Sequence, residues 1–197
     1  MTGRAFCLDT PRLTLRDWRE EDWPVFFRHT NTPAVMRWLG GAMDEGRMAI
    51  QRARIEATHQ RHGHCFWVLE RQADGGHLSG ELLGFCGLKR ADTPGSPVEG
   101  EMEVGWRLRE DAWGRGYAKE AAEATLRTGF EHFAADRIIA LTVTENQASW
   151  GLMRRLGMRR HEELDHEELH QPAGRRHTIV HAIERAQWQA AQAAAHG

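Results

Sequence analysis

The sequence is poor in the features that mark disulfide-stabilised, secreted and membrane proteins. Its three cysteines, Cys7, Cys65 and Cys86, are odd in number, widely spaced and without a Cys-x-x-Cys pair, as expected of reduced thiols. No run of about 18 apolar residues occurs, and the first residues lack the apolar core of a signal peptide. We therefore expect a cytoplasmic protein with no disulfide framework.

The chain also lacks an excess of charge of either sign. Its 26 lysine and arginine residues stand against 28 aspartate and glutamate residues, and the two signs are well mixed along the sequence. Nucleic acids and anionic membranes select strongly basic partners. We therefore expect neither as a partner, and the sequence leaves a monomer and a homodimer equally open.

The chain of 197 residues is long enough to bury a substantial core, and neither a repeat nor a long linker divides it. We expect a single domain over 1–197, with 185–197 as a frayed terminal helix. Hydrophobic periodicity predicts strands at 12–16, 65–71, 82–89, 99–108, 137–143, 159–165 and 178–184, and further helices at 20–29, 33–38, 45–61, 117–133 and 148–156. Strand, helix and strand alternate only over 99–143, so the class is α/β (α+β) with a mixed sheet.

The most informative segment is Ala-Trp-Gly-Arg-Gly-Tyr-Ala at 112–118, between an expected strand and an expected helix. Two glycines let the backbone approach a ligand with its N–H groups pointing inward, and the following helix adds its positive N-terminal end. The segment therefore predicts a cradle for a diphosphate. A bare loop explains an isolated Gly-x-Gly more often, so the prediction depends on the neighbouring sequence.

The glycine spacing excludes two better-known phosphate loops. A P-loop requires a glycine, four further residues and then Gly-Lys-Ser/Thr, whereas Gly116 is followed by Tyr-Ala-Lys. A dinucleotide fingerprint requires Gly-x-Gly-x-x-Gly, and Lys119 occupies the position of its third glycine. We therefore expect neither ATP bound by a P-loop nor a dinucleotide.

The expected strand before the cradle places two carboxylates on one face. Glu101, Glu103, Gly105 and Arg107 alternate with Met102, Val104, Trp106 and Leu108. The carboxylates are candidates for proton transfer, and a half-buried strand with a polar solvent face is the alternative.

Histidine is abundant, but its spacing does not predict a metal site. His62 and His64 form half of a plausible cluster, and no third ligand has the required spacing. We therefore expect no metal.

Four blocks of sequence, taken in order, resemble the GNAT superfamily of N-acetyltransferases. They are Glu-Val-Gly-Trp-Arg-Leu at 103–108, Trp-Gly-Arg-Gly-Tyr-Ala-Lys-Glu-Ala at 113–121, Glu-Asn-Gln-Ala-Ser at 145–149, and the segment 153–158. The opening segment 13–22 and Leu-Asp-His at 164–166 are also similar, so the resemblance covers most of the chain. It is strongest to the branch that acetylates ribosomal proteins. It implies a mixed, mostly antiparallel central sheet of six to seven strands, flanked by helices, with two central strands splayed at the cofactor site.

The resemblance also implies acetyl-CoA as the co-substrate. In this family the cradle binds the pyrophosphate, and the preceding strand hydrogen-bonds the pantetheine amides as a neighbouring strand would. Trp106, Arg107 and Leu108 would then meet pantetheine. The pyrophosphate would be held, chiefly by backbone N–H groups, by Trp113, Gly114, Arg115, Gly116, Tyr117, Ala118 and Lys119. The first cradle position is usually Gln or Arg in the family, so Trp113 removes one side-chain contact.

The implied reaction is direct attack of an amine on the thioester carbonyl, which needs a base because an alkyl ammonium has a pKa of about 10. Glu103 matches the glutamate of the family and is the expected base, with Glu101 in reserve. Many relatives use a tyrosine as the acid, but the chain has one tyrosine and it lies in the cradle. Ser149 is the catalytic candidate near the sulfur, or else it satisfies N–H groups of its own helix. Asn146 is an N-cap, a cofactor contact or both.

We therefore expect an acyltransferase that moves an acetyl group to a primary amine, on a protein N-terminus or a small molecule. A non-catalytic acyl-CoA-binding regulatory module is the alternative, motivated by the missing tyrosine. The segment 20–61 and the late strand loop would choose the acceptor, with His166 and His177 lining its site. The acidic residues at 162–168 would attract a cationic acceptor or form a solvated charge run.

Overall fold

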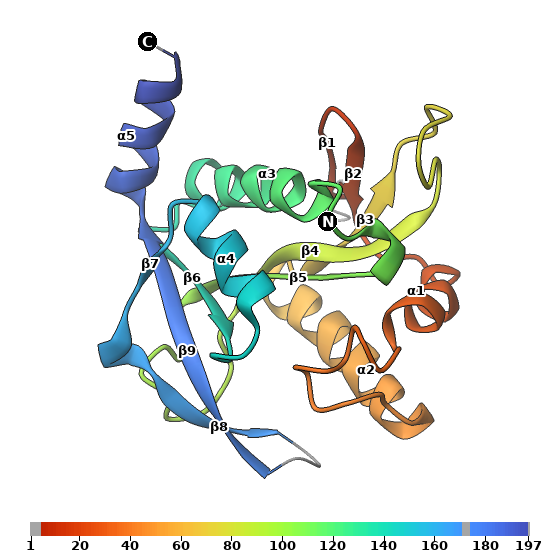
Figure 1. Ribbon diagram of the computed structural model, residues 1–197, viewed down its shortest axis with the longest axis horizontal. Helices are drawn as coiled ribbons and strands as arrows, with labels where there is room; N and C mark the ends of the chain where they lie inside the picture. The colour runs from red at the N-terminus through yellow and green to blue at the C-terminus, as the bar shows by residue number, and fades with distance from the viewer. Residues whose placement is uncertain (1–4, 171–173, 197) are drawn as a thin grey trace. The chain divides into compact units, whose positions relative to one another are not determined.

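The computed structural model describes residues 5–170 and 174–196, which contain five α-helices and nine β-strands (Figure 1). The helices are α1 (Asp22–Thr30), α2 (Glu45–His62), α3 (Tyr117–Glu131), α4 (Gln147–Arg155) and α5 (Arg185–His196). The strands are β1 (Cys7–Asp9), β2 (Leu13–Arg16), β3 (Phe66–Arg71), β4 (Leu82–Arg90), β5 (Met102–Leu108), β6 (Arg137–Thr142), β7 (Arg159–Arg160), β8 (His166–His170) and β9 (Gly174–Glu184). Two 3-10 helices cover Glu110–Ala112 and Glu162–Leu164.

The chain forms two compact units. The first contains the residues up to Lys89 together with Gly105–Ala124, and the second contains Arg90–Val104 together with the residues from Thr125 onward. Strand β5 and helix α3 therefore contribute residues to both units.

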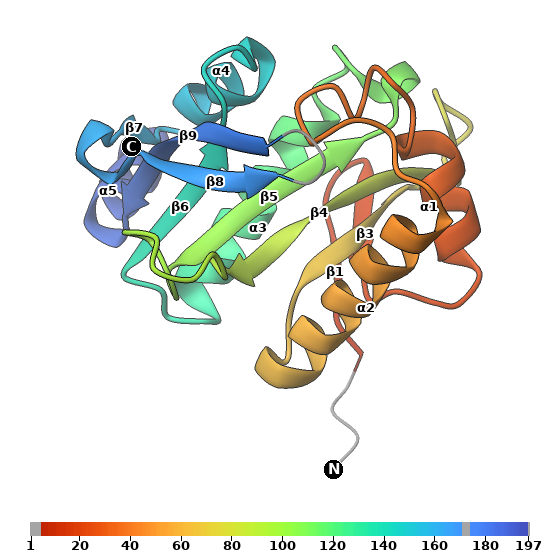
Figure 2. The same cartoon turned by 90° about the horizontal axis from the view of Figure 1, so that it is seen from below.

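In the first unit, β1 to β4 form an antiparallel meander in which each strand pairs with the next. Leu13 and Leu15 of β2 point into the core and are fully buried, as the alternation of a strand requires. Helices α1 and α2 pack against β3 and β4 (Figure 2), where Phe26 of α1 and Ile55 of α2 join Phe85 of β4 in one apolar cluster. These two helices are the segment that was expected to select the acceptor.

In the second unit, β6 lies between β5 and β9. It runs parallel to β5, with Glu103 opposite Ile139, and antiparallel to β9, with Ile139 opposite Ala182. Strand β9 also pairs with β7 and β8, and it continues directly into α5 (Figure 1). Ile139, Val180 and Ala182 form the centre of an apolar cluster in this unit.

The structure confirms the mixed, mostly antiparallel sheet and most of the expected helices. The helix predicted at 33–38 is wrong: the segment forms consecutive turns before Gly40 and Gly41, which have φ values of 86° and 80°. A segment this short gains too few hydrogen bonds to offset helix nucleation. The strand predicted at 159–165 is wrong beyond Arg160, because β7 ends there and Glu162–Leu164 form a 3-10 helix. The splayed strands and the single-domain organisation stay predictions.

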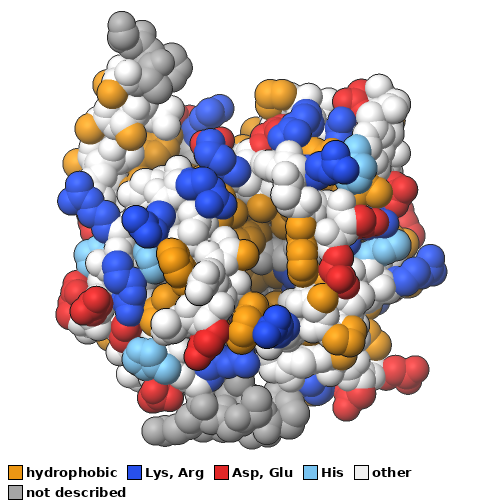
Figure 3. All heavy atoms as spheres, in the orientation of Figure 1, with side chains coloured by type: hydrophobic (Ala, Val, Ile, Leu, Met, Phe, Trp, Pro, Cys, Tyr) orange, Lys and Arg blue, Asp and Glu red, His pale blue; other side chains and the backbone are white. Residues whose placement is uncertain are grey.

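Among the described residues, no helix combines the length and the apolar character needed to cross a membrane. Side chains of both signs are interspersed on the face shown in Figure 3. This distribution agrees with the nearly balanced charge of the sequence.

Candidate functional site

The predicted cradle lies in the first unit, between the 3-10 helix that ends at Ala112 and the start of α3. Gly114 and Gly116 have φ values of 70° and 81°, which L side chains rarely adopt. The N–H of Glu120 donates to the carbonyl oxygen of Gly116 at 3.1 Å as α3 begins. The backbone N–H groups of the residues before Glu120 lie in the first turn of α3. No helical turn precedes them, so they have no helical carbonyl oxygen to donate to. The loop and this turn therefore present backbone donors, and the helix dipole, to an anion.

Arg12 fastens this loop to the sheet of the first unit. Its Nε donates to Oε2 of Glu120 at 2.7 Å, and its Nη1 donates to the carbonyl oxygen of Arg115 at 3.0 Å. Oε1 of Glu120 accepts from the hydroxyl of Thr10 at 2.6 Å. Burial raises the pKa of Glu120, but the hydrogen bonds from Thr10 and Arg12 outweigh it and lower the pKa below its ordinary value. The carboxylate of Glu120 therefore stays ionised and joins the start of α3 to the segment that contains Thr10 and Arg12.

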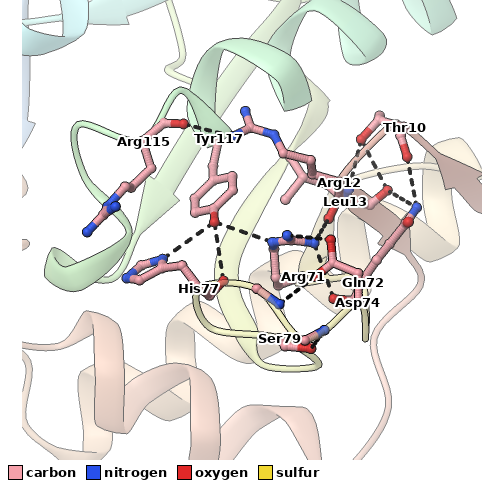
Figure 4. A network of polar contacts seen from close by, with 12 residues as sticks. Thr10, Arg12, Leu13, Arg71, Gln72, Asp74, His77, Ser79, Arg115 and Tyr117 are labelled. Atoms are coloured by element: carbon pink, nitrogen blue, oxygen red, sulfur yellow. Dashed lines mark hydrogen bonds and ion pairs between the residues drawn. The ribbon is translucent and has the colours of Figure 1, made fainter.

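The side chain of Tyr117 is buried at the start of α3, with 3% of the residue exposed. Its hydroxyl donates to the carbonyl oxygen of His77 at 3.2 Å and accepts from Nε of Arg71 at 3.3 Å (Figure 4). Arg71 in turn donates to Asp74 at 2.6 Å, and the Arg12 guanidinium lies 4.7 Å from the centre of the tyrosine ring. The single tyrosine of the chain is thus a structural anchor of the cradle.

Trp106, Arg107 and Leu108 are the last three residues of β5 and lie in the first unit. Trp106 is half-buried, and Arg107 and Leu108 are buried. The indole Nε1 of Trp113 donates to the carbonyl oxygen of Leu108 at 3.0 Å. The only side-chain donor of Trp113 is therefore used by the strand, and the expected loss of one phosphate contact stays a prediction.

The expected basic side chains of the cradle, Arg115 and Lys119, are exposed. Nζ of Lys119 lies 2.6 Å from Oε1 of Glu123, one helical turn later. An exposed pair of this kind contributes little to stability, so the lysine can exchange its partner for a phosphate at small cost.

The second unit holds the residues expected to carry the chemistry. Glu103 of β5 is 8% exposed and lies opposite Ile139 of β6. Glu101 forms an ion pair with Arg137, and this hydrogen bond raises the pKa of Arg137. The carboxylate of Glu101 is thus held by a neighbouring cation. The role of Glu103 as the base, with Glu101 in reserve, stays a prediction.

Asn146 caps helix α4, and its side-chain oxygen accepts from the N–H of Ser149 at 3.4 Å. The N-cap prediction for Asn146 is therefore confirmed, whereas its contact with a cofactor stays a prediction. The cap accounts for one N–H group of the first turn, and both interpretations of Ser149 stay predictions.

The acidic residues at 162–168 form local pairs with neighbouring basic side chains. His166 Nε2 lies 3.2 Å from Glu168 Oε1, and His177 Nδ1 lies 3.2 Å from Glu167 Oε1. The further pairs are Arg160–Asp165 and His161–Glu163. In the part of the chain that the structure describes, no group of three or more His, Cys, Asp or Glu residues is placed to hold a metal ion.

Sequence reasoning misses the residues that support the cradle from outside the motif. Thr10, Arg12, Arg71 and His77 all contact Tyr117 or Glu120 in the first unit. Glu120 belongs to the matching block of sequence, so an acidic residue in the first turn after the cradle was the one available signal that a cationic partner lies nearby.

Comparison with known proteins agrees with this geometry. A family model described as an acetyltransferase (GNAT) domain matches residues 12–159. The uncharacterized protein YkkB of Bacillus subtilis is 30% identical over 152 residues, which are 77% of this chain and 84% of that protein. The uncharacterized N-acetyltransferase YnaD of the same organism is 28% identical over 155 residues, which are 78% of this chain and 82% of that protein.

Solved structures share the fold at lower identity. An acetyltransferase from Agrobacterium tumefaciens superposes with a TM-score of 0.73 at 23% identity, covering 93% of this chain and 97% of that one. Spermidine N-acetyltransferase from Vibrio cholerae, in complex with CoA and spermine, gives a TM-score of 0.70 at 15% identity and covers 91% and 99%.

Proposed function

The chain belongs to the GNAT family of acetyltransferases, which take the acetyl group from acetyl-CoA, and we propose that its acceptor is a primary amine. The observation that carries the first half of the proposed reaction, the binding of acetyl-CoA, is the supported cradle. Gly114 and Gly116 adopt positive φ at the start of α3, and Arg12 and Tyr117 fix the same loop to the sheet. This arrangement suits the pyrophosphate of acetyl-CoA.

In the proposed complex, the backbone N–H groups of 113–119 hold the pyrophosphate, and the side chains of Arg115 and Lys119 add positive charge. The backbone of Trp106, Arg107 and Leu108 pairs with the pantetheine amides. Backbone donors suit this role because their positions are fixed by the fold before the ligand arrives.

The proposed chemistry uses Glu103 as the base. Its carboxylate accepts a proton from the ammonium of the acceptor, directly or through a water. The amine nitrogen then attacks the thioester carbonyl, the carbon–sulfur bond breaks, and the nitrogen loses its second proton as CoA leaves as the thiol. Ser149 is the proposed relay for that proton: its hydroxyl donates to the thiolate and takes up the proton that the nitrogen releases. The backbone N–H of Val104 is the proposed oxyanion donor.

The acceptor is proposed to be a protein N-terminus or a small-molecule amine. The likeness of the sequence to the branch that acetylates ribosomal proteins favours the first. A panel that contains ribosomal-protein N-terminal peptides, spermidine, an aminoglycoside and amino acids separates these classes.

The test measures thiol release from acetyl-CoA with this panel and, in parallel, CoA binding by thermal shift. We expect CoA to stabilise the protein and at least one amine to release thiol. Binding of CoA without turnover on any amine would favour the non-catalytic acyl-CoA-binding module instead. Failure of CoA to stabilise the wild type, while ATP or NAD does so, would overturn the cradle assignment.

A further inference from the structure

Arg107 is a buried arginine in the part of β5 that belongs to the first unit, with 8% of the residue exposed. Its Nη1 donates to Oε1 of Gln51 on α2 at 3.2 Å. Among the described residues, Nε is buried without a hydrogen-bond partner, and no ion pair with a carboxylate compensates the charge. Burial lowers the pKa of Arg107 to about 10, so the side chain still carries its charge near neutral pH.

The other two buried arginines of the first unit both have carboxylate partners among the described residues. Arg71 lies 2.6 Å from Asp74, and Arg109 lies 2.6 Å from Asp111. Burying a charge without a partner is strongly destabilising. The contrast indicates that the partner of Arg107 is supplied from outside the chain.

The surroundings of Arg107 suit an anion. The guanidinium carbon lies 5.3 Å from the ring centre of Phe26 and 5.1 Å from that of Phe85, and Phe66 stacks on Phe85 at 4.5 Å. Apolar walls exclude water and strengthen an ionic contact, while the amide of Gln51 adds a polar group beside the cation. A planar guanidinium with a vacant donor is matched to a carboxylate.

The charges of the two reactants, acetyl-CoA and the acceptor, indicate which of them would supply an anion to Arg107. All negative charges of acetyl-CoA are on its phosphates, which the proposed function assigns to the cradle. The pantetheine arm and the acetyl group are uncharged. Gln51 and Phe26 come from α2 and α1, the helices expected to select the acceptor.

We propose that Arg107, with Gln51, binds a carboxylate of the acceptor, so that the substrate class is a primary amine that also carries a carboxylate. This inference rests on the proposed function and narrows its acceptor. Free amino acids and peptides with an acidic residue near the N-terminus share this chemistry.

The test compares acceptors that differ only in the charge of one group. β-Alanine is paired with β-alaninamide, L-phenylalanine with L-phenylalaninamide, and a peptide that begins with glutamate with one that begins with glutamine. We expect the wild type to prefer the acid of at least one pair by about 10- to 100-fold in kcat/KM, the range of a charged hydrogen bond. The pair that shows the preference distinguishes a free amino acid from a peptide.

Arg107→Met should remove this preference without raising the KM for acetyl-CoA more than about twofold. Arg107→Lys should keep part of it, because lysine retains the charge and loses the planar fork. Arg109→Met is the matched control: it unpairs Asp111 and should lower the Tm without changing the ratio of acid to amide. The Tm of Arg107→Met should equal or exceed that of the wild type, since an uncompensated buried charge is removed.

Three results would overturn the proposal: no acid preference in the wild type, a preference that survives in Arg107→Met, or an equal loss on acid and amide with a raised KM for acetyl-CoA. If no amine is acetylated, the proposed function fails, but the carboxylate subsite can still be tested. Calorimetry then measures the binding of 3-phenylpropionate and glutarate to the CoA-saturated protein. Binding by the wild type that Arg107→Met loses supports the subsite. Equal binding, or no binding, by the two proteins contradicts it.

Discussion

Arg12 and Glu120 form an ion pair of 2.7 Å, from Nε to Oε2, although 108 residues separate them in the sequence. The same guanidinium donates to the carbonyl oxygen of Arg115 inside the cradle. The shape of the proposed cradle therefore depends on a side chain that lies far outside the motif.

Arg12→Met should weaken CoA binding by about 5- to 10-fold, because the cradle loses a contact that orders it. The side chain of Arg12 is 40% exposed, so the free energy of unfolding should fall by less than about 1 kcal/mol. Calorimetric titration with CoA measures the first effect and urea denaturation the second. Arg52→Met, which breaks surface pairs with Glu20 and Glu56, is the control and should leave CoA affinity unchanged.

Tyr117→Phe should lower the free energy of unfolding by about 1 to 2 kcal/mol, since a buried hydroxyl loses its contacts with Arg71 and His77. The kcat of this variant, and the pH profile of kcat, should stay as in the wild type. A lost or displaced alkaline limb in that profile would show that the hydroxyl takes part in proton transfer.

Gly116→Val should abolish CoA binding. The residue has a φ of 81°, which a β-branched side chain adopts only with strain, so the backbone of the cradle must change its conformation. An added Cβ would make only ordinary contact with Nη2 of Arg12, at 3.4 Å. Gly114→Ala is the milder comparison, because φ is also positive there but no atom lies within 4 Å of an added Cβ. Unchanged CoA affinity of the Gly116 variant would contradict the cradle assignment.

Glu103→Gln should lower kcat by about 100-fold or more, the range of a general base, with little change in acetyl-CoA affinity. Glu101→Gln should have a much smaller effect on kcat, because this carboxylate is engaged with Arg137. Steady-state kinetics of the two variants shows which of the two carboxylates acts as the base. A parallel loss of kcat and acetyl-CoA affinity in the Glu103 variant would make the residue structural.

The stability of the fold should depend on pH through His181 of β9. The residue is 3% exposed, and burial, followed by the charge of Arg160, lowers its pKa from 6.5 to about 4. Between these values the unfolded chain binds more protons than the folded one. The free energy of unfolding should therefore fall as the pH is lowered from about 6.5 to 4, by on the order of 2 kcal/mol.

Urea denaturation across this pH range measures the slope, and His181→Asn is the control. The slope should become flatter in the variant. If it does not, the carboxylates near His181, such as Asp165, account for the acid sensitivity instead.

Much of the fold follows from local patterns in the sequence. The alternation around Leu13 and Leu15 predicts β2, and Gly63, with a φ of 73°, ends α2 close to the predicted boundary. The end of β7 at Arg160 is not predictable from the same signals, because this strand is two residues long and is defined by its pairing with β9.

The candidate site was predictable only where its residues adjoin in sequence. The spacing of the two glycines predicts the cradle, whereas nothing in the sequence around Arg71 indicates that its side chain will contact Tyr117. Alternation assigns Arg107 to a face of β5, but its neighbours among the described residues, Gln51, Phe26 and Phe85, come from α2, α1 and β4, which the strand pattern does not describe.

The pairing of Thr10 and Arg12 with Glu120 also sets a time order for the protein during its synthesis. The early residues emerge from the ribosome while the loop that they support does not yet exist, so the supported loop cannot form until α3 has been made. Contacts this distant in sequence form slowly because a long loop must close first. A nascent chain interrupted before α3 would contain the residues of the meander but lack the loop that Thr10 and Arg12 hold in place.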